Sequence, residues 1–342
     1  SYREHIIDIK IENADRYRTK KIKKYDITNV SKEASDYPFI ILYTSGTTTT
    51  PKAVEINDDA LMNLFVAYND ADNRTEHSVV LCCMPLYHVM GLMMSALSGL
   101  YIGANVVCMS VSEFYTDTLA WYINVARYKV SHTCISNYMV SMLTSSIESL
   151  NENYDAKILS LSSMKSMVLA GERVNPITID AFIKVAKTYG FDDKALNVSY
   201  GLTESASTFT HTDADKILNR INTIDAGEVF SVGKIFSGYK MIIIDENEDI
   251  INDKLMLGEF CINGPSIIEC YCNIDNDNDM DKSFINIDGE KYFSTGDIGF
   301  FNIVDGDKEF YISNRNKDVL IIHGENYSPA VIEELAEQIS PY

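Results

Sequence analysis

The first two-thirds of the chain alternate short apolar runs, rich in β-branched residues, with segments of helical periodicity. In residues 57–70, for example, apolar side chains recur every three or four positions behind Asn57 or Asp58, either of which can cap a helix. Alternation of this kind predicts an α/β fold with helices packed on a largely parallel sheet. Strands are expected at 39–43, as a buried strand, and at 53–56, 78–84, 104–109, 164–171 and 195–200, and helices at 57–70, 90–101, 118–128 and 176–190.

After about residue 225 the pattern changes. Short strand-like runs follow one another, Gly and Asp turns separate them, and long helical patterns are missing until the last residues. This pattern predicts a small β-rich subdomain, in form a distorted barrel. Its strands are expected at 239–245, 258–264, 308–314 and 318–323, and a final helix is expected at 328–340.

Charge excludes several classes of partner. The 342 residues include 29 Lys and Arg against 49 Asp and Glu, a net charge of −20. Nucleic acids and anionic membranes attract basic surfaces, so neither is expected as a partner. The longest apolar stretch, 90–102, is too short for a membrane span, which needs about 20 residues. The basic run 18–24 is interpreted as a solvated face, with a docking strip for an acidic protein as the alternative.

The seven cysteines indicate a reducing compartment. Cys270 and Cys272 form a C-x-C pair without two further metal ligands nearby, which argues against a metal site. Reduced thiols are typical of cytoplasmic proteins, and we expect that location. The other five cysteines have apolar sequence neighbours and are expected to be buried thiols: Cys82, Cys83, Cys108, Cys134 and Cys261.

Residues 43–54 read YTSGTTTTPKAV, a run of hydroxyl side chains beside Lys52. Because the run lies between two strand-like segments, we expect a hairpin loop rather than a strand–helix phosphate loop. Backbone N–H groups and hydroxyls together form a cradle for phosphate oxygens, and Lys52 adds positive charge. A plain polar turn is the alternative interpretation of this segment taken alone.

Three further segments accompany this loop: YGLTES at 200–205, YFSTGD at 292–297 and SNRNKDVLIIHGENYSPAVIEE at 313–334. In this order the four segments resemble those of the adenylate-forming superfamily, which includes acyl-CoA synthetases, peptide-synthetase adenylation domains and luciferase. MPLYHVMGLMM at 84–94 and the segment 112–143 are most similar to the fatty acyl-AMP ligase branch.

The resemblance implies that ATP and Mg²⁺ convert a carboxylic acid to an acyl-adenylate and pyrophosphate. A weakly nucleophilic carboxylate must attack the α-phosphate, so the site has to hold two anions together and neutralise the triphosphate. By family similarity Glu204 would bind Mg²⁺, Asp297 the ribose hydroxyls, and Arg315 the ribose or a phosphate. The other implied nucleotide contacts are Thr44, Ser45, Gly46, Thr47 and Thr48 at the β- and γ-phosphates, Gly171 and Glu172 at the adenine edge, and Tyr200, followed by Gly201, stacked on adenine.

His88 would lie beside the carboxylate that is activated, and with Glu204 and Lys52 it completes the implied catalytic set. We expect an apolar acid, because a methionine-rich segment follows His88 and methionine adapts to flexible chains. Ordinary core packing is the alternative interpretation of these methionines. The acyl-binding residues expected on this basis are Met90, Gly91, Met93, Met94, Ser136, Asn137 and Tyr138.

Four positions depart from the family pattern. Thr49 and Ala53 stand where glycine is usual, and Val89 stands where the fatty acyl-AMP ligases commonly have aspartate. If position 49 requires a positive φ, threonine there costs about 1–2 kcal/mol. Asn314 precedes Arg315 in place of the usual glycine, and asparagine tolerates the left-handed conformation better than most residues.

The resemblance also predicts the domain organisation. Residues 1–225 would carry α/β nucleotide- and acyl-binding subdomains, 226–314 the β-rich subdomain, and 315–342 a hinge at Lys317 and Asp318 with the start of a mobile lid domain. The lid lysine that the family uses is not among the 342 residues, so we expect this chain alone to have low activity.

Three functions remain open from the sequence. The first is an acyl-AMP ligase that passes its product to the phosphopantetheine thiol of an acyl carrier protein. The second is an acyl- or aryl-CoA ligase, and the third is a degenerate module that binds nucleotide or acyl-AMP without turnover. Activation of an α-amino acid is disfavoured, because no carboxylate near His88 would pair with the substrate ammonium.

Overall fold

The computed structural model describes residues 38–44, 51–150, 157–212, 220–223, 227–271, 283–315, 320–322 and 325–327, all within a compact unit that spans 38–342. These residues form a five-stranded parallel sheet, an eight-stranded antiparallel sheet and three two-stranded pairs. The predicted α/β fold with a β-rich part is therefore confirmed.

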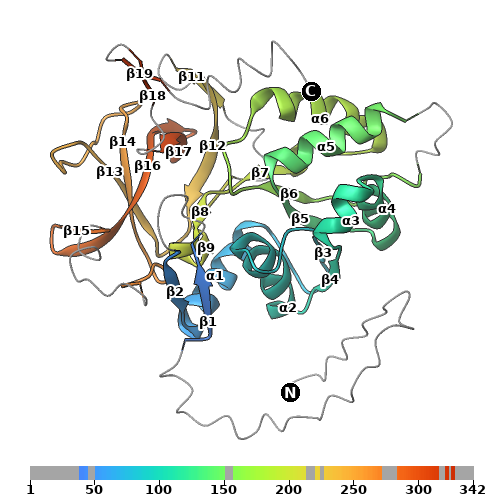
Figure 1. The fold of residues 1–342 in the computed structure, drawn as a ribbon, viewed down its shortest axis with the longest axis horizontal. Helices are drawn as coiled ribbons and strands as arrows, with labels where there is room; N and C mark the ends of the chain where they lie inside the picture. The colour runs from blue at the N-terminus through green and yellow to red at the C-terminus, as the bar shows by residue number, and fades with distance from the viewer. Residues whose placement is uncertain are drawn as a thin grey trace, which may run out of the picture. The chain divides into compact units, whose positions relative to one another are not determined.

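The parallel sheet has the strand order β4-β3-β5-β6-β7. Its strands are short and mostly buried, as expected when helices cover both faces. Figure 1 shows α5 and α6 on one face and α1 with α2 on the other. The strands are β3 (Val79–Cys82), β4 (Asn105–Cys108), β5 (His132–Ile135), β6 (Ser166–Leu169) and β7 (Leu196–Val198).

The helices begin and end where local chemistry predicts. Asn57 Oδ1 accepts from the N–H of Ala60 and caps the first helix, and Asn175 caps the sixth, which has Pro176 at its start and is followed by a left-handed Gly190. The α-helices are α1 (Asp58–Ala71), α2 (Ser98–Tyr101), α3 (Val111–Thr116), α4 (Leu119–Tyr128), α5 (Asn137–Glu148) and α6 (Pro176–Ala186). Short 3₁₀ turns are η5 (Lys187–Tyr189), η6 (Asp193–Ala195) and η7 (Thr203–Ser205).

The segment expected as one helix at 90–101 is a π-helix, η4 (Met90–Leu97), that continues into α2. Within it the carbonyl of Met94 accepts from Arg74 Nη1 at 2.5 Å and from Ser98 Oγ at 2.7 Å. The helical prediction was correct, but the sequence did not predict the π form or the contact with Arg74, which lies 20 residues earlier in the chain.

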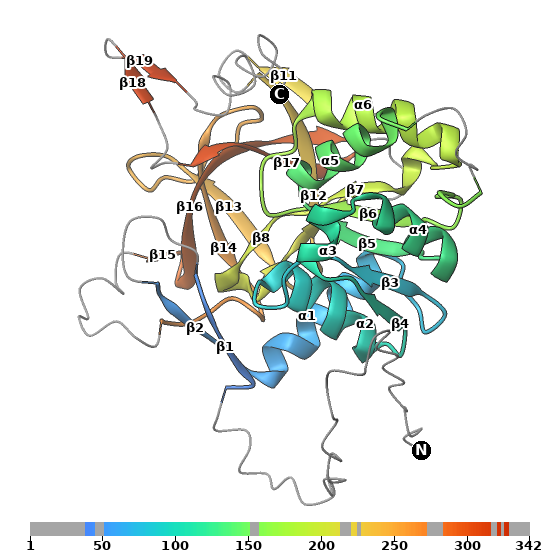
Figure 2. The same ribbon diagram turned by 45° about the vertical axis from the view of Figure 1, so that its right-hand side comes forward.

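The antiparallel sheet has the order β10-β12-β17-β16-β14-β13, with β11 paired to β12 and β15 to β16. Figure 2 shows the long strands β16 and β17 side by side. The bounds are β10 (Thr210–His211), β11 (Arg220–Thr223), β12 (Gly227–Ile235), β13 (Lys240–Ile244), β14 (Gly258–Asn263), β15 (Phe284–Ile287), β16 (Glu290–Val304) and β17 (Asp307–Arg315). The small pairs are β1 (Ile40–Tyr43) with β2 (Ala53–Ile56), β8 (Gly201–Leu202) with β9 (Ser207–Thr208), and β18 (Leu320–Ile322) with β19 (Glu325–Tyr327).

Two expectations about burial were wrong. Strand β1 is not a buried strand, because the hairpin β1–β2 packs only one face on the core and leaves Ile41 and Tyr43 exposed. Cys108 is exposed because β4 is the edge strand of its sheet, whereas Cys82, Cys83, Cys134 and Cys261 are buried free thiols as expected. Cys272, the basic run 18–24 and the helix expected at 328–340 lie outside the described residues.

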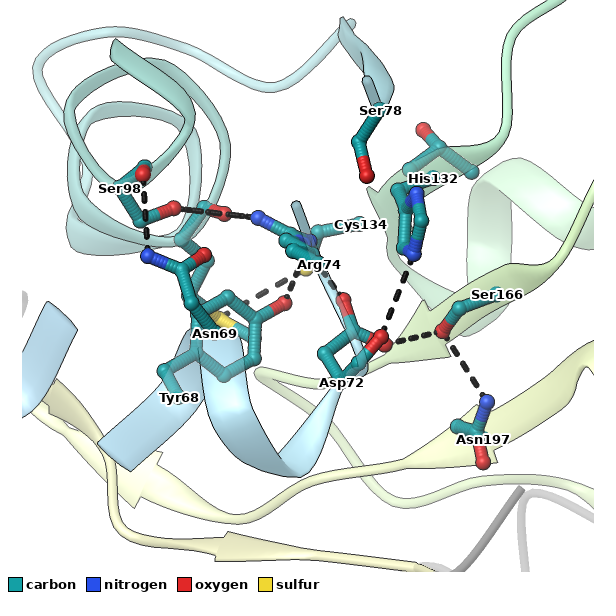
Figure 3. A network of polar contacts seen from close by, with 12 residues as sticks. Tyr68, Asn69, Asp72, Arg74, Ser78, Ser98, His132, Cys134, Ser166 and Asn197 are labelled. Atoms are coloured by element: carbon teal, nitrogen blue, oxygen red, sulfur yellow. Dashed lines mark hydrogen bonds and ion pairs between the residues drawn. The ribbon is translucent and has the colours of Figure 1, made fainter. Parts of the chain in front are cut away.

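A buried polar network joins α1, η4 and the parallel sheet (Figure 3). Asp72 and Arg74 form an ion pair of 2.6 Å, and neither side chain has any exposed surface. Ser166 on β6 donates to Asp72, and Asn197 on β7 donates to Ser166 Oγ at 3.0 Å. Burial alone would raise the pKa of Asp72, but Arg74 and two neighbouring histidines outweigh it and hold that pKa well below its usual range.

No helix in the described part of the chain is long and apolar enough to cross a membrane.

Candidate functional site

Most of the predicted site residues follow the carboxyl ends of the parallel strands. His88 follows β3, Asn137 follows β5, Gly171 follows β6 and Tyr200 follows β7. The chain leaves β3 toward β4 on one side and leaves β5 toward β6 on the other, so the strand order reverses between β3 and β5. In open α/β sheets, ligands bind outside the carboxyl ends at such a switch point. The topology therefore points to the same edge of the sheet as the sequence.

His88 lies in a tight turn between β3 and η4. The N–H of Met90 donates to His88 Nδ1 at 3.2 Å, so the neutral ring carries its proton on Nε2. Burial lowers the pKa of His88, which keeps the ring neutral at physiological pH. Gly91 allows the turn to close: a Cβ there would lie 2.3 Å from the carbonyl oxygen of Pro85.

The N-terminus of α5 is hydrogen-bonded to the loop that follows β6. Glu172 Oε1 accepts from the N–H of Tyr138 at 2.8 Å, and Asn137 Oδ1 accepts from the N–H of Asn175 at 2.9 Å. A carboxylate at this position also interacts favourably with the helix dipole. The segments predicted to bind adenine and acyl groups are thus joined directly.

Gly171 connects this loop to η4. Its φ is +86°, and a Cβ there would lie 2.5 Å from Sδ of Met90. Met90, Met93 and Met94 are buried in the hydrophobic core. Their burial fits the core-packing interpretation, and an acyl-binding role for Met90, Gly91, Met94, Asn137 and Tyr138 stays a prediction.

Tyr200 and Asp297 meet between the two sheets. The Tyr200 hydroxyl donates to Asp297 Oδ2 at 2.5 Å, and both residues are buried. The Tyr200 ring packs edge-on against Phe209 and Phe260, with centroids 5.2 and 6.1 Å away. Stacking of this ring on adenine stays a prediction. Gly201 is required by the close approach of β9, since a Cβ there would lie 1.9 Å from the carbonyl oxygen of Ser207.

A turn within β16 positions Asp297. Gly296 has a φ of +74°, its N–H donates to Glu259 Oε1 at 3.1 Å, and Thr295 Oγ1 accepts from the N–H of Asp297 at 3.0 Å. Asp297 pairs in register with Arg315 at the end of β17, so the predicted ribose ligands stand opposite one another on neighbouring strands. The Arg315 side chain, Lys317 and Asp318 lie outside the described residues.

Lys52 and Glu204 are brought together by a residue that the sequence did not single out. Lys52 Nζ lies 4.6 Å from the ring centroid of Tyr271, and the Tyr271 hydroxyl donates to Glu204 Oε1 at 2.6 Å. Tyr271 lies between the C-x-C cysteines, which drew attention to metal binding instead. No group of three or more potential metal ligands occurs among the described residues.

The hairpin at Thr44 and Lys52 is formed as predicted. The N–H of Thr44 donates to the carbonyl of Lys52 at 2.9 Å, and the N–H of Lys52 donates to Thr44 Oγ1 at 3.3 Å. The phosphate-cradle residues Ser45, Gly46, Thr47 and Thr48, and also Thr49, lie outside the described residues. Ala53 pairs with Tyr43 in the β1–β2 ladder, where alanine is unstrained.

A cavity of about 460 Å³ lies elsewhere, among β12, β13, β16 and β17, and no predicted site residue lines it. Three lysines on its wall already have partners, which argues against an anion site: Lys234 with Asp307 at 2.5 Å, Lys240 with Glu290, and Lys308 over the Phe301 ring at 4.0 Å.

The chain has the fold of the adenylate-forming enzymes, in which a parallel sheet is joined to an antiparallel sheet. The predicted site residues lie at the switch point of the parallel sheet, and the antiparallel sheet supplies Asp297. The chain belongs to the AMP-binding enzyme family, whose profile matches residues 3–272.

Three comparisons illustrate this similarity. The chain is 27% identical over 350 residues to the medium-chain-fatty-acid–[acyl-carrier-protein] ligase JamA of Moorena producens (strain JHB), covering 96% of the chain and 57% of that protein. It is 28% identical over 297 residues to 4-coumarate–CoA ligase 4 of Arabidopsis thaliana, covering 86% and 47%. The fatty acyl-adenylate ligase of L. pneumophila, solved with acyl adenylate and pyrophosphate, has a TM-score of 0.72 and 25% identity over 88% of this chain and 54% of that one. The chain thus spans about half the length of the curated relatives it matches.

Proposed function

We propose that the protein uses ATP to convert a carboxylic acid to an acyl-adenylate, with release of pyrophosphate. Two sets of contacts carry this proposal: Tyr271 contacts both Lys52 and Glu204, and Tyr200 donates to Asp297. The four predicted site residues in these contacts lie up to 245 positions apart in the numbering. The family membership and the position of His88 at the strand switch point support it.

The residues present fit a bound Mg²⁺. This cation prefers one or two carboxylates plus phosphate oxygens and water to a cage made only of protein ligands. Glu204 is a carboxylate on a short 3₁₀ turn, and Tyr271 already fixes one of its oxygens. Glu204 would therefore hold the metal, which when bound neutralises charge on the triphosphate. Lys52 would add a second positive charge to the phosphates.

The remaining roles follow from hydrogen-bonding capacity. Asp297 is held by Tyr200 and would accept from the ribose hydroxyls. The neutral His88 ring would donate through Nε2 to the acid carboxylate without adding a full charge. Holding the carboxylate and the α-phosphate in one orientation accounts for much of the catalysis expected of such a site.

We further propose a fatty acid as substrate and a carrier-protein thiol as acceptor. The relative from Moorena producens, a fatty-acid–[acyl-carrier-protein] ligase by its name, supports this version. The 4-coumarate–CoA ligases support the second candidate, a ligase that uses free CoA and an aryl acid.

The experiment is pyrophosphate release by the full-length protein across fatty, aryl and amino acids, followed by incubation with CoA or with carrier protein. Release with fatty acids and transfer only to the carrier supports the proposal. Efficient acyl-CoA formation would instead support the second candidate function, a CoA ligase. Nucleotide binding without release of pyrophosphate would show a module without turnover.

A further inference from the structure

Tyr271 lies between the two charged residues that the proposed site needs at the phosphates. Its hydroxyl donates to Glu204 Oε1 at 2.6 Å, while Lys52 Nζ lies over its ring, 4.6 Å from the centroid. Lys52 enters on the β1–β2 hairpin, Glu204 on η7 and Tyr271 on the segment after β14. One side chain therefore contacts the charged groups of two elements, Lys52 on the β1–β2 hairpin and Glu204 on η7.

The segment that carries Tyr271 is hydrogen-bonded to η7. The N–H of Ile268 donates to the carbonyl of Glu204 at 2.9 Å, and Ser266 Oγ donates to the carbonyl of Ser205 at 2.8 Å. The Tyr271 ring is 5% exposed and packs edge-on against Phe293, with centroids 6.4 Å apart. These contacts leave the phenol little freedom, so its hydroxyl has a fixed direction.

Both contacts of Tyr271 suit its chemistry. A phenol hydroxyl donates to a carboxylate, and the face of a phenol ring attracts an ammonium group. The hydrogen bond to Glu204 and the contact with Lys52 are of these two kinds.

We propose that Tyr271 is a positioning residue for the metal and phosphate groups of this site. Its hydroxyl fixes one oxygen of Glu204 and leaves the second oxygen to Mg²⁺, and its ring holds the Lys52 ammonium close to the same carboxylate. This inference rests on the proposed function, because it assigns Mg²⁺ and ATP phosphates to Glu204 and Lys52.

Without the phenol, Glu204 and Lys52 would each have to be ordered by the ligand itself. Hydrogen-bond partners of metal-ligating carboxylates typically account for 10–100-fold in metal affinity or activity. Tyr271→Phe removes the hydroxyl but keeps the ring. We expect it to raise the Mg²⁺ concentration for half-maximal ATP binding about 10-fold or more, with the KM for the carboxylic acid changed by less than about two-fold.

The matched control is Tyr292→Phe. Tyr292 is also a buried residue whose hydroxyl donates to a glutamate, Glu290, at 3.0 Å, but Tyr292 lines the cavity among β12, β13, β16 and β17, where no predicted site residue lies. The control should leave the Mg²⁺ dependence unchanged.

Tyr271→Leu removes ring and hydroxyl together, and we expect it to raise the KM for ATP further even at saturating Mg²⁺.

The experiment is calorimetric titration of ATP into full-length wild type and each variant at a series of Mg²⁺ concentrations, with pyrophosphate exchange and thermal unfolding measured in parallel. A higher Mg²⁺ concentration for half-maximal ATP binding in folded Tyr271→Phe, but not in Tyr292→Phe, supports the proposal. Equal Mg²⁺ dependence in wild type and Tyr271→Phe would overturn it, as would an equal rise in the KM for the acid. Wild type that binds no ATP with Mg²⁺ would refute the proposed function itself, and this inference with it.

Discussion

Arg74 makes four side-chain hydrogen bonds without any exposed surface. Besides Asp72 it contacts the Met94 carbonyl, Ser98 Oγ and the Tyr68 hydroxyl, and it stacks over the Tyr68 ring at 4.5 Å. Removing one member of a buried ion pair leaves the other charge without compensation. The segment 72–77 follows α1 and is rich in polar residues, and only the tertiary contacts reveal a buried ion pair in it.

Arg74→Met should therefore destabilise the fold strongly. Leaving Asp72 buried and unpaired is expected to lower the free energy of unfolding by about 3–5 kcal/mol. Urea unfolding followed by circular dichroism measures the change. Lys187→Met is the control, because the Lys187–Asp193 pair at 2.7 Å is solvent-exposed and should contribute little. Equal losses of unfolding free energy in Arg74→Met and Lys187→Met would contradict the conclusion that the buried Asp72–Arg74 pair contributes more to stability than the exposed pair does.

His132 gives the same network a pH dependence. Burial lowers the pKa of His132 to about 4, and its Nε2 lies 3.2 Å from the Asp72 carbonyl oxygen. Below its ordinary pKa of 6.5 the unfolded chain binds a proton at His132 that the folded chain does not, so stability should fall as the pH falls from 6.5 to about 4. The depressed pKa of Asp72 adds a further loss once the unfolded carboxyl begins to protonate.

Replacing His132 by Asn should reduce the slope of the unfolding free energy against pH by up to the equivalent of one bound proton. The free energy of unfolding in urea, measured between about pH 7 and about pH 4.5, gives the slope. The same substitution at the exposed His77 serves as control and should keep the wild-type slope. Identical slopes for wild type and His132→Asn would show that another group governs the decline.

Among the elements, those with a strong local pattern were predictable. Helix α1 has both an apolar face and an Asn57 cap, and strands β3 and β6 lie in apolar runs. Strand β5 reads HTCI, which is not an apolar run, and was not predicted. Strand β1 looked equally apolar but is exposed on one side, because only its partner strand and a single core face cover it. The π form of η4 was not predicted, and its Met94 carbonyl accepts from Arg74, 20 residues earlier in the chain, a contact that no local pattern indicates.

Gly91→Ala tests the turn that places His88. A Cβ at this position would overlap the carbonyl oxygens of Pro85 and Met84, at 2.3 and 2.6 Å, so the turn has to shift. We expect a loss of about 1–3 kcal/mol in unfolding free energy, and a raised KM for the carboxylic acid with unchanged affinity for ATP with Mg²⁺.

The control for this turn is Ser95→Ala in the same π-helix. The Ser95 hydroxyl is buried and has no hydrogen-bond partner among the described residues, so its removal should be neutral or slightly stabilising. Gly91→Ala with wild-type stability and wild-type KM would mean that the turn is not needed to place His88.

At the scale of the whole molecule, the order of four motifs was enough to predict the family and the α/β fold. It also led to the prediction of Glu204 and Asp297 as site residues, and the structure shows the hydrogen bond that each of them accepts. The tyrosine beside Glu204 escaped prediction because an isolated tyrosine carries no periodic or spacing signal. Its contact with Glu204 becomes visible only in the fold, where the segment after β14 is hydrogen-bonded to η7.

The most direct test of the account is exchange of labelled pyrophosphate into ATP, measured with a panel of carboxylic acids. We predict exchange by full-length wild type that depends on a fatty acid, and a loss on the order of 10²-fold or more in Glu204→Gln, because a preorganised group at the phosphates is removed. Glu290→Gln, which alters a phenol-bonded glutamate away from the site, should exchange at the wild-type rate. Exchange that Glu204→Gln retains in full, or the absence of exchange with every acid in the wild type, would contradict the account.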